Sequence, residues 1–292
     1  MALFPLMTGA EEARELRWLR FINCFSAGAA LSLSGLIFQS ISRNPLADPY
    51  LSGTAPAALL GYLTGMLVAG GDGRGELWAI GFSVLTGLAV ALVSFLTSKN
   101  GRLTMLLFGI LIGSVSVSLT NLLTYYFPER AVLQKLASFS ISSLDLPDTG
   151  FGLWALAGAG VAGVVLDLFF RPQMLALTLT GDKAASLGAS ARSWLLGLVL
   201  TASILTSLVT VSYGLVGFIG FVVPNVLRRV AGVSFRLLFM TSVVLGGLGV
   251  AAADGLGRLL VPPYGVPAGI LTSLLGAPFL LFVLLRRGSA RA

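Results

Sequence analysis

Apolar segments, each of roughly twenty residues, follow one another along the whole chain and are separated by short polar stretches. A helix needs about 20 apolar residues to cross the ~30 Å hydrocarbon core of a bilayer. The pattern therefore predicts an all-α integral membrane protein, a polytopic bundle of about nine transmembrane helices. The predicted spans are residues 19–41, 52–70, 77–97, 103–126, 151–170, 191–212, 214–231, 236–257 and 267–285.

The polarity changes abruptly between the first two spans. Residues 35–53 read GLIFQSISRNPLADPYLSG, so polar residues, two prolines and a glycine interrupt an otherwise apolar helix pattern. Proline disfavours a helix at its own position and at the residue before it. We call residues 43–53 the elbow. A polar turn where two membrane helices meet water is a candidate gate or docking element, although the same pattern fits an inert turn.

Composition supports a membrane protein with one domain. The chain is 56% hydrophobic and 11% charged, whereas soluble domains are about 25% charged. No linker divides residues 17–287, which we interpret as a single transmembrane domain between a short polar segment, residues 1–16, and a tail, residues 288–292. The single Cys24 excludes an internal disulfide framework. The absence of histidine argues against a built-in metal site.

The basic residues predict the orientation, because loops on the cytoplasmic side carry an excess of Lys and Arg. With nine spans, the loops on the same side as Arg43, Lys99 and Arg192 hold more basic residues than the loops on the side of Arg14 and Arg130. The N-terminus is therefore expected outside and the C-terminus in the cytoplasm. The net charge of +7 follows from this asymmetry, and we expect no nucleic-acid partner.

Residues 172–190, on the cytoplasmic side, are amphipathic although they lie between two spans. Asp182 can cap a short helix and Gly188 can end it. Short amphipathic helices on this face fit a groove in a partner protein. A solvated loop resting on the membrane surface is an equally good interpretation of the pattern.

Charged residues near the outer face allow two interpretations. Asp254 and Arg258 are four residues apart in the eighth span, and Arg17 and Arg20 are three apart at the start of the first. Such residues can neutralise one another or reach the interface, or they can recognise acidic groups on a partner. Taken singly, each favours the structural role. Glycines at helix-packing spacing, such as Gly61 and Gly65, favour packing within the chain over an interface with a second copy.

Several blocks in order resemble the FecCD family, the permease subunits of bacterial ABC importers for iron-siderophores, haem and cobalamin. The resemblance covers residues 17–287. Its blocks are the Arg17–Arg20 pair, SGLIFQSISRNPLADPYLSG, LTGDKAASLGAS, GLVGFIGFVVPNVLRRVAG, the Asp254–Arg258 pair and VPAGILTSLLGAPFLLFVLLRR.

The resemblance implies a mechanism and partners. Two permease copies would form one translocation path in the bacterial or archaeal cytoplasmic membrane, surrounded by lipid. Two separate ATPase subunits would use ATP and Mg, so the chain itself would be no enzyme and would hold no cofactor, in agreement with its lack of a GxxxxGK[ST] loop. A periplasmic or lipoprotein binding protein would deliver the substrate, and alternating access would follow ATP-driven closure of the ATPase subunits.

The resemblance also implies roles for single residues. Asn44 and Leu46 match the cytoplasmic gate. Arg17, Arg20 and Arg258 match arginines that receive glutamates of the binding protein. The ATPase-coupling residues are matched by Gly181, Asp182, Lys183, Ala184, Ser186, Leu187 and Gly188.

The chain departs from the family pattern at a few points. Family members usually have ten spans, and the first of these is not found in the residues before Arg17. The usual Pro-His of the seventh span is Pro224-Asn225 here, and Gly265 stands where a glutamate is common. The last departure leaves no carboxylate at that point of the outer face.

Two other transporter classes compete with this interpretation. A secondary transporter driven by an ion gradient usually needs acidic groups within the membrane, and the spans offer only Asp167, near a span end, and Asp254. A zinc or manganese permease would favour histidine in its path, and the chain has none. The sequence leaves the chelate open among iron-siderophore, haem and corrinoid.

Overall fold

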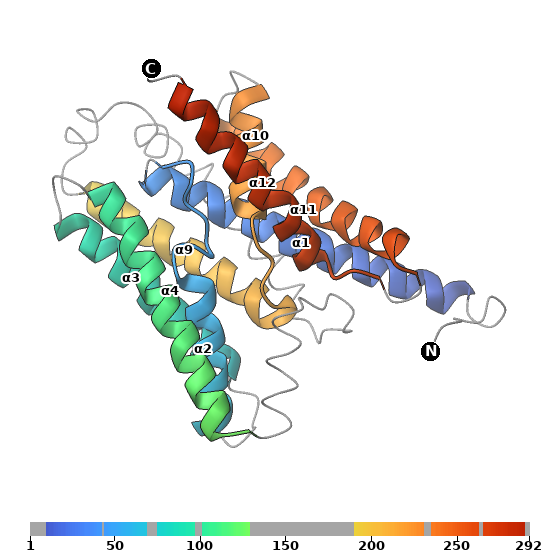
Figure 1. Ribbon diagram of the computed structural model, residues 1–292, viewed down its shortest axis with the longest axis horizontal. Coiled ribbons are helices and arrows are strands. Elements are labelled where there is room, and N and C mark those ends of the chain that lie inside the picture. The colour runs from blue at the N-terminus through green and yellow to red at the C-terminus, as the bar shows by residue number, and fades with distance from the viewer. Residues whose placement is uncertain are drawn as a thin grey trace.

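The computed structural model describes residues 10–42, 44–68, 75–96, 101–128, 190–230, 235–262 and 265–289, and these form an all-helical bundle (Figure 1). The predicted span at 151–170 and the predicted coupling residues, Gly181 to Gly188, lie outside the described residues. The other eight predicted spans each correspond to one helix. The helices are α1 (Ala10–Ser42), α2 (Thr54–Val68), α3 (Gly75–Leu96), α4 (Gly101–Tyr126), α9 (Ser190–Tyr213), α10 (Ile219–Val230), α11 (Phe235–Leu260) and α12 (Ala268–Ser289).

Not every predicted span forms a helix of full length. In the part of the chain that the structure describes, five helices are long and apolar enough to cross a membrane, and they contain Leu16–Ser42, Gly75–Val93, Thr104–Tyr126, Leu196–Tyr213 and Leu237–Leu260. Apolar helices over Thr54–Val68, Ile219–Arg228 and Ala268–Leu281 are shorter. The count of nine full spans is therefore not established by the described residues.

The bundle has two groups of helices that meet at α9. In one group α1 lies antiparallel to α11 and also contacts α10, and α12 packs on α10 and α11 (Figure 1). In the other group α2 packs against α3 and α4, while α9 contacts α1, α2 and α3. The larger apolar core centres on α1, where Leu33, Leu36 and Phe38 have no exposed surface. The elbow therefore begins at the end of a helix that is buried in this core.

Close helix contacts within the chain are made at glycines. A side chain on Gly28 of α1 would collide with the backbone of Gly246 in α11. A Cβ on Gly61 would lie 2.5 Å from the carbonyl oxygen of Trp78, and one on Gly109 would lie 2.9 Å from that of Leu51. These contacts agree with the prediction that the glycines serve packing within the chain, because only glycine lets two backbones approach this closely.

The second helix is short and enclosed. With 15 residues, α2 is about 22 Å long at 1.5 Å per residue. Most of its side chains are buried, since α3, α4 and α9 surround it. The elbow leads directly into this enclosed helix.

Candidate functional site: the elbow and the cavity beside it

The elbow is built from turns that its own side chains stabilise. The side-chain Oδ1 of Asn44 accepts a 3.0 Å hydrogen bond from the backbone N–H of Leu46. The Oδ1 of Asp48 accepts one of 2.8 Å from the N–H of Tyr50. Such Asx turns are what Asn and Asp favour beside proline. The elbow ends at Gly53, whose φ of 78° suits glycine, and α2 starts at Thr54.

Helix α10 lies against the elbow and the end of α1. Asn225 donates from Nδ2 to the carbonyl oxygen of Pro45 at 2.6 Å. Gln39 donates from Nε2 to the carbonyl oxygen of Gly220 at 3.0 Å, and its Oε1 accepts from Nη1 of Arg228 at 2.8 Å. The sequence alone predicted no role for Gln39, Asn225 or Arg228. The only indication was Pro224-Asn225, which differs from the Pro-His that is usual in the family.

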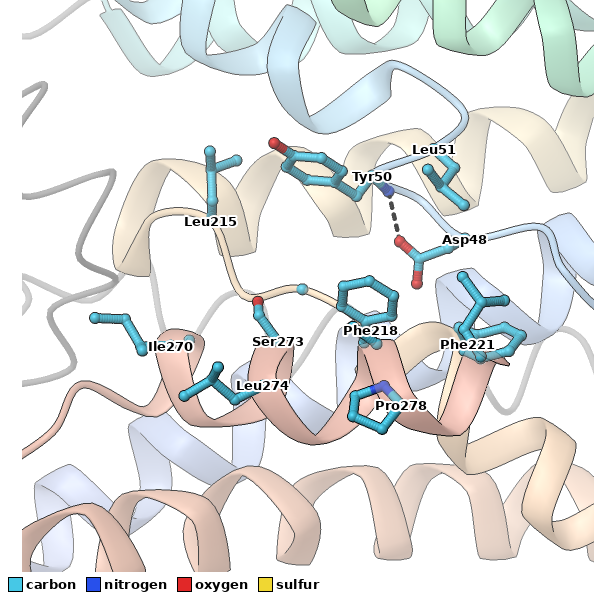
Figure 2. A pocket seen from close by; sticks show the side chains of 14 residues that line it. Asp48, Tyr50, Leu51, Leu215, Phe218, Phe221, Ile270, Ser273, Leu274 and Pro278 are labelled. Carbon is cyan, nitrogen blue, oxygen red and sulfur yellow. Dashed lines mark hydrogen bonds between the residues drawn. The ribbon is translucent and has the colours of Figure 1, made fainter. Parts of the chain in front are cut away.

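A cavity of about 730 Å³ opens beside the elbow (Figure 2). Its walls come from the elbow, from the segment between α9 and α10, and from α12. In Figure 2, Asp48, Tyr50 and Leu51 lie on the elbow side of the cavity, and Ile270, Leu274 and Pro278 lie on the side of α12. The lining is mostly apolar and consists of Asp48, Tyr50, Leu51, Leu215, Gly217, Phe218, Phe221, Gly269, Ile270, Ser273, Leu274, Ala277, Pro278 and Leu280.

Asp48 is the acidic residue in this lining. It is buried, with 5% of its surface exposed. Burial raises the pKa of Asp48 to about 6, because desolvation disfavours the carboxylate, while the backbone N–H groups of Tyr50, Phe221 and Leu51 oppose the shift. In the sequence, Asp48 is one of the polar residues of the elbow. Its place before a proline predicted the turn but not its burial.

The predicted outer-face arginines meet at one end of α1 and α11. Arg20 donates from Nε to Oδ2 of Asp254 at 2.7 Å and from Nη2 to Oδ1 at 2.6 Å. Arg258 lies farther from the same carboxylate, with its Nε 3.5 Å from Oδ2. The pair predicted from spacing, Asp254 with Arg258, is therefore present, but Arg20 makes the closer contact. Arg17 is exposed near this end of α1.

The predicted gate residues and the predicted docking arginines thus lie in two separate places. Asn44 and Leu46 are half-buried in the elbow at the end of α1, and Arg17 and Arg20 lie near its beginning. No cluster of three His, Cys, Asp or Glu residues suited to a metal ion occurs among the residues with described positions.

Comparison with known proteins gives the family. The chain matches the FecCD transport family over residues 6–286. The hemin transport system permease protein HmuU of Yersinia pestis is 32% identical over 287 residues, which cover 95% of this chain and 84% of HmuU. The vitamin B12 import system permease protein BtuC of Photorhabdus laumondii is 30% identical over 286 residues, which cover 96% and 83%.

A solved structure supports the same architecture. An inward-facing metal-chelate type ABC transporter superposes with a TM-score of 0.79, covering 98% of this chain and 92% of that one at 22% identity. At 22% identity, this match supports the fold alone. Together with the relatives, it favours an ABC permease over the ion-driven alternative. The chain belongs to the FecCD transport family and is a multi-pass membrane permease of the ABC importer class.

Proposed function

We propose that this permease imports a large metal chelate, an iron-siderophore, haem or cobalamin, in the direction of the cytoplasm. The observation that carries the proposal is the family match over residues 6–286. The names of its relatives refer to hemin, vitamin B12 and iron-hydroxamate. The apolar cavity beside the elbow is consistent with passage of a large ligand that the permease does not bind tightly.

The path would form between this chain and a second copy, with the elbow at its cytoplasmic end. Asn44 and Leu46 are the proposed gate residues. Their half-buried positions leave part of each side chain accessible. Asx turns and prolines fix the backbone around them, so opening would require the elbow to move as a unit.

Energy would come from two separate ATPase subunits that bind ATP and Mg, and this chain would hold no cofactor. The proposed coupling residues run from Gly181 to Gly188, with Asp182 and Lys183 anchoring the contact. Charge reversal at both positions should abolish ATPase assembly or transport. Normal assembly and normal transport in that variant would contradict the assignment.

Substrate would arrive on a periplasmic or lipoprotein binding protein at the outer face of the cytoplasmic membrane. Arg17, Arg20 and Arg258 are the proposed docking residues. Because Asp254 binds Arg20 closely, the more exposed Arg17 and Arg258 are the better placed to meet carboxylates of the partner. Arg20 would hold the cluster together.

The test is transport in proteoliposomes that contain the permease, its ATPase and its binding protein. Ferric siderophore, haem and cobalamin are supplied in turn, with and without ATP. We expect uptake of one chelate class that depends on both ATP and the binding protein. Uptake that follows an ion gradient and ignores ATP would overturn the proposal. A binding screen of the partner protein against the same three ligands identifies the chelate.

A further inference from the structure

The proline in α10 leaves one backbone acceptor without its helical partner. Pro224 has no N–H, so the carbonyl oxygen of Gly220, four residues earlier, cannot receive the usual helical hydrogen bond. Gln39 of α1 supplies the missing donor, with its Nε2 3.0 Å from this oxygen. Gln39 is buried, with 1% of its surface exposed. A buried amide of α1 thus completes the hydrogen bonding of another helix.

The same amide is oriented from its other side. Arg228, two turns after Gly220 in α10, donates from Nη1 to Oε1 of Gln39 at 2.8 Å. The amide of Gln39 is therefore used at both its oxygen and its nitrogen by groups of α10. A buried polar network with satisfied partners is rigid and specific in geometry.

A second contact joins α10 to the elbow itself. Asn225, 5% exposed, directs its Nδ2 to the carbonyl oxygen of Pro45 at 2.6 Å and to that of Phe221 at 2.8 Å. Pro45 lies between the two proposed gate residues, Asn44 and Leu46. The first turns of α10 also press closely on α1, because a Cβ on Gly220 would lie 2.8 Å from the carbonyl oxygen of Leu31.

We propose that Gln39, Asn225 and Arg228 are positioning residues: Asn225 fastens the elbow to α10, while Gln39 and Arg228 fasten the adjoining end of α1 to α10, so that the elbow and α10 move together. The inference rests on the proposed function for the meaning of elbow movement, and its geometry is independent of the substrate. When α10 shifts, Asn225 carries Pro45 with it, and thereby the gate residues on either side. Without these contacts the elbow loses its attachment and opens without a signal from the ATPase.

Cysteine labelling tests the attachment directly. Cys24 is the single cysteine and is buried, so a Cys24→Ala background with Leu46→Cys reports on the elbow alone. In the assembled complex, an impermeant maleimide should label Leu46→Cys severalfold faster when Asn225→Leu is added, since leucine has a similar volume but no donor. Val226→Ala, at an exposed neighbouring position of α10, should leave the rate unchanged.

Two further variants separate positioning from general damage. Asn225→His retains an N–H that can reach Pro45, and it should restore slow labelling. Gln39→Glu keeps an acceptor for Arg228 but loses the donor to Gly220, and it should also speed labelling. Equal labelling rates in Asn225→Leu, Gln39→Glu and the parent would overturn the proposal, as would faster labelling that Asn225→His fails to reverse.

Chelate leakage links the attachment to transport. Proteoliposomes loaded with the chelate should release it without ATP when they carry Asn225→Leu, and should retain it when they carry Val226→Ala. If labelling changes as expected while even the unmodified complex moves none of the three chelates, the proposed substrate class fails and the attachment stands. If the unmodified complex transports and Asn225→Leu retains the chelate, the attachment does not control the gate.

Discussion

At the scale of single residues, the cluster of Arg20, Asp254 and Arg258 shows what local spacing can and cannot predict. Asp254 and Arg258 are four apart, so a helix brings them together and the sequence predicts the pair. Arg20 is far from Asp254 in sequence, and only the packing of α1 on α11 brings its guanidinium within 2.6 Å of the carboxylate. The sequence thus identified the residues but not the closer partner.

Replacing Asp254 should destabilise the protein at the junction of α1 and α11. Asp254→Ala removes two hydrogen bonds between charged groups, which contribute about 1.5–3 kcal/mol each, and it leaves the largely buried Arg20 without this carboxylate. We expect a clear loss of thermal stability in detergent, measured by unfolding in the purified protein. Arg17→Ala, at an exposed position, should change stability little. Equal effects of the two variants would contradict the role of Asp254.

Asp48 should make stability depend on pH. Burial raises the pKa of Asp48 to about 6, so the folded protein binds this proton more tightly than the unfolded chain. Its contribution to the free energy of unfolding is therefore fully present below pH ~4, falls between about pH 4 and 6, and stays low above that. Asp48→Asn is neutral throughout. Relative to the unmodified protein, this variant should gain thermal stability from pH 4 to 6, and a constant difference would contradict the assignment.

At the scale of elements, hydropathy predicted where helices occur better than where they begin. The span predicted at 214–231 starts as a helix only at Ile219. Before it, Gly214 and Phe218 have φ values of 81° and 65°, which end α9 and redirect the chain. Phe218 is apolar and reads as helix in a hydropathy profile. In the fold Phe218 packs closely on Gly276 of α12, a contact that the sequence does not display.

The contact between α1 and α11 depends on the absence of a side chain at Gly28. In Gly28→Ala the new methyl group would meet the backbone of Gly246 and a methyl group of Val250, and overpacking of this kind costs about 1–3 kcal/mol. Gly255→Ala, also in a helix, has open space around its Cβ and should keep or raise stability. Thermal unfolding of the two variants compares them. If Gly28→Ala is as stable as the unmodified protein, α1 and α11 can move apart without loss of stability.

At the scale of the whole molecule, the sequence predicted the fold class. It did not predict which segments come together around the elbow and its cavity. Lipid requires backbone groups to be satisfied within helices, so apolar length alone indicates an all-helical bundle. The elbow was also recognisable, because prolines and polar residues interrupt an apolar pattern. The cavity, the burial of Asp48 and the Gln39–Gly220 contact could not be predicted, since each joins segments far apart in sequence.

The predicted orientation can be tested with two engineered cysteines in a Cys24→Ala background. Lys99 precedes α4, and Tyr126, 68% exposed, ends it. With the positive side inside, an impermeant maleimide should label Tyr126→Cys in intact cells and Lys99→Cys only after permeabilisation. The reverse pattern would place the N-terminus in the cytoplasm.

The shortness and enclosure of α2 affect how the protein responds to its membrane. At about 22 Å, α2 would be mismatched to a hydrocarbon layer of about 30 Å if lipid surrounded it. Its neighbours shield it, while α3 and α4 expose residues such as Leu85 and Leu111. Forces from a thicker or thinner bilayer therefore act first on α3 and α4. They reach the elbow through α4, whose Gly109 packs against the backbone of Leu51 and Ser52.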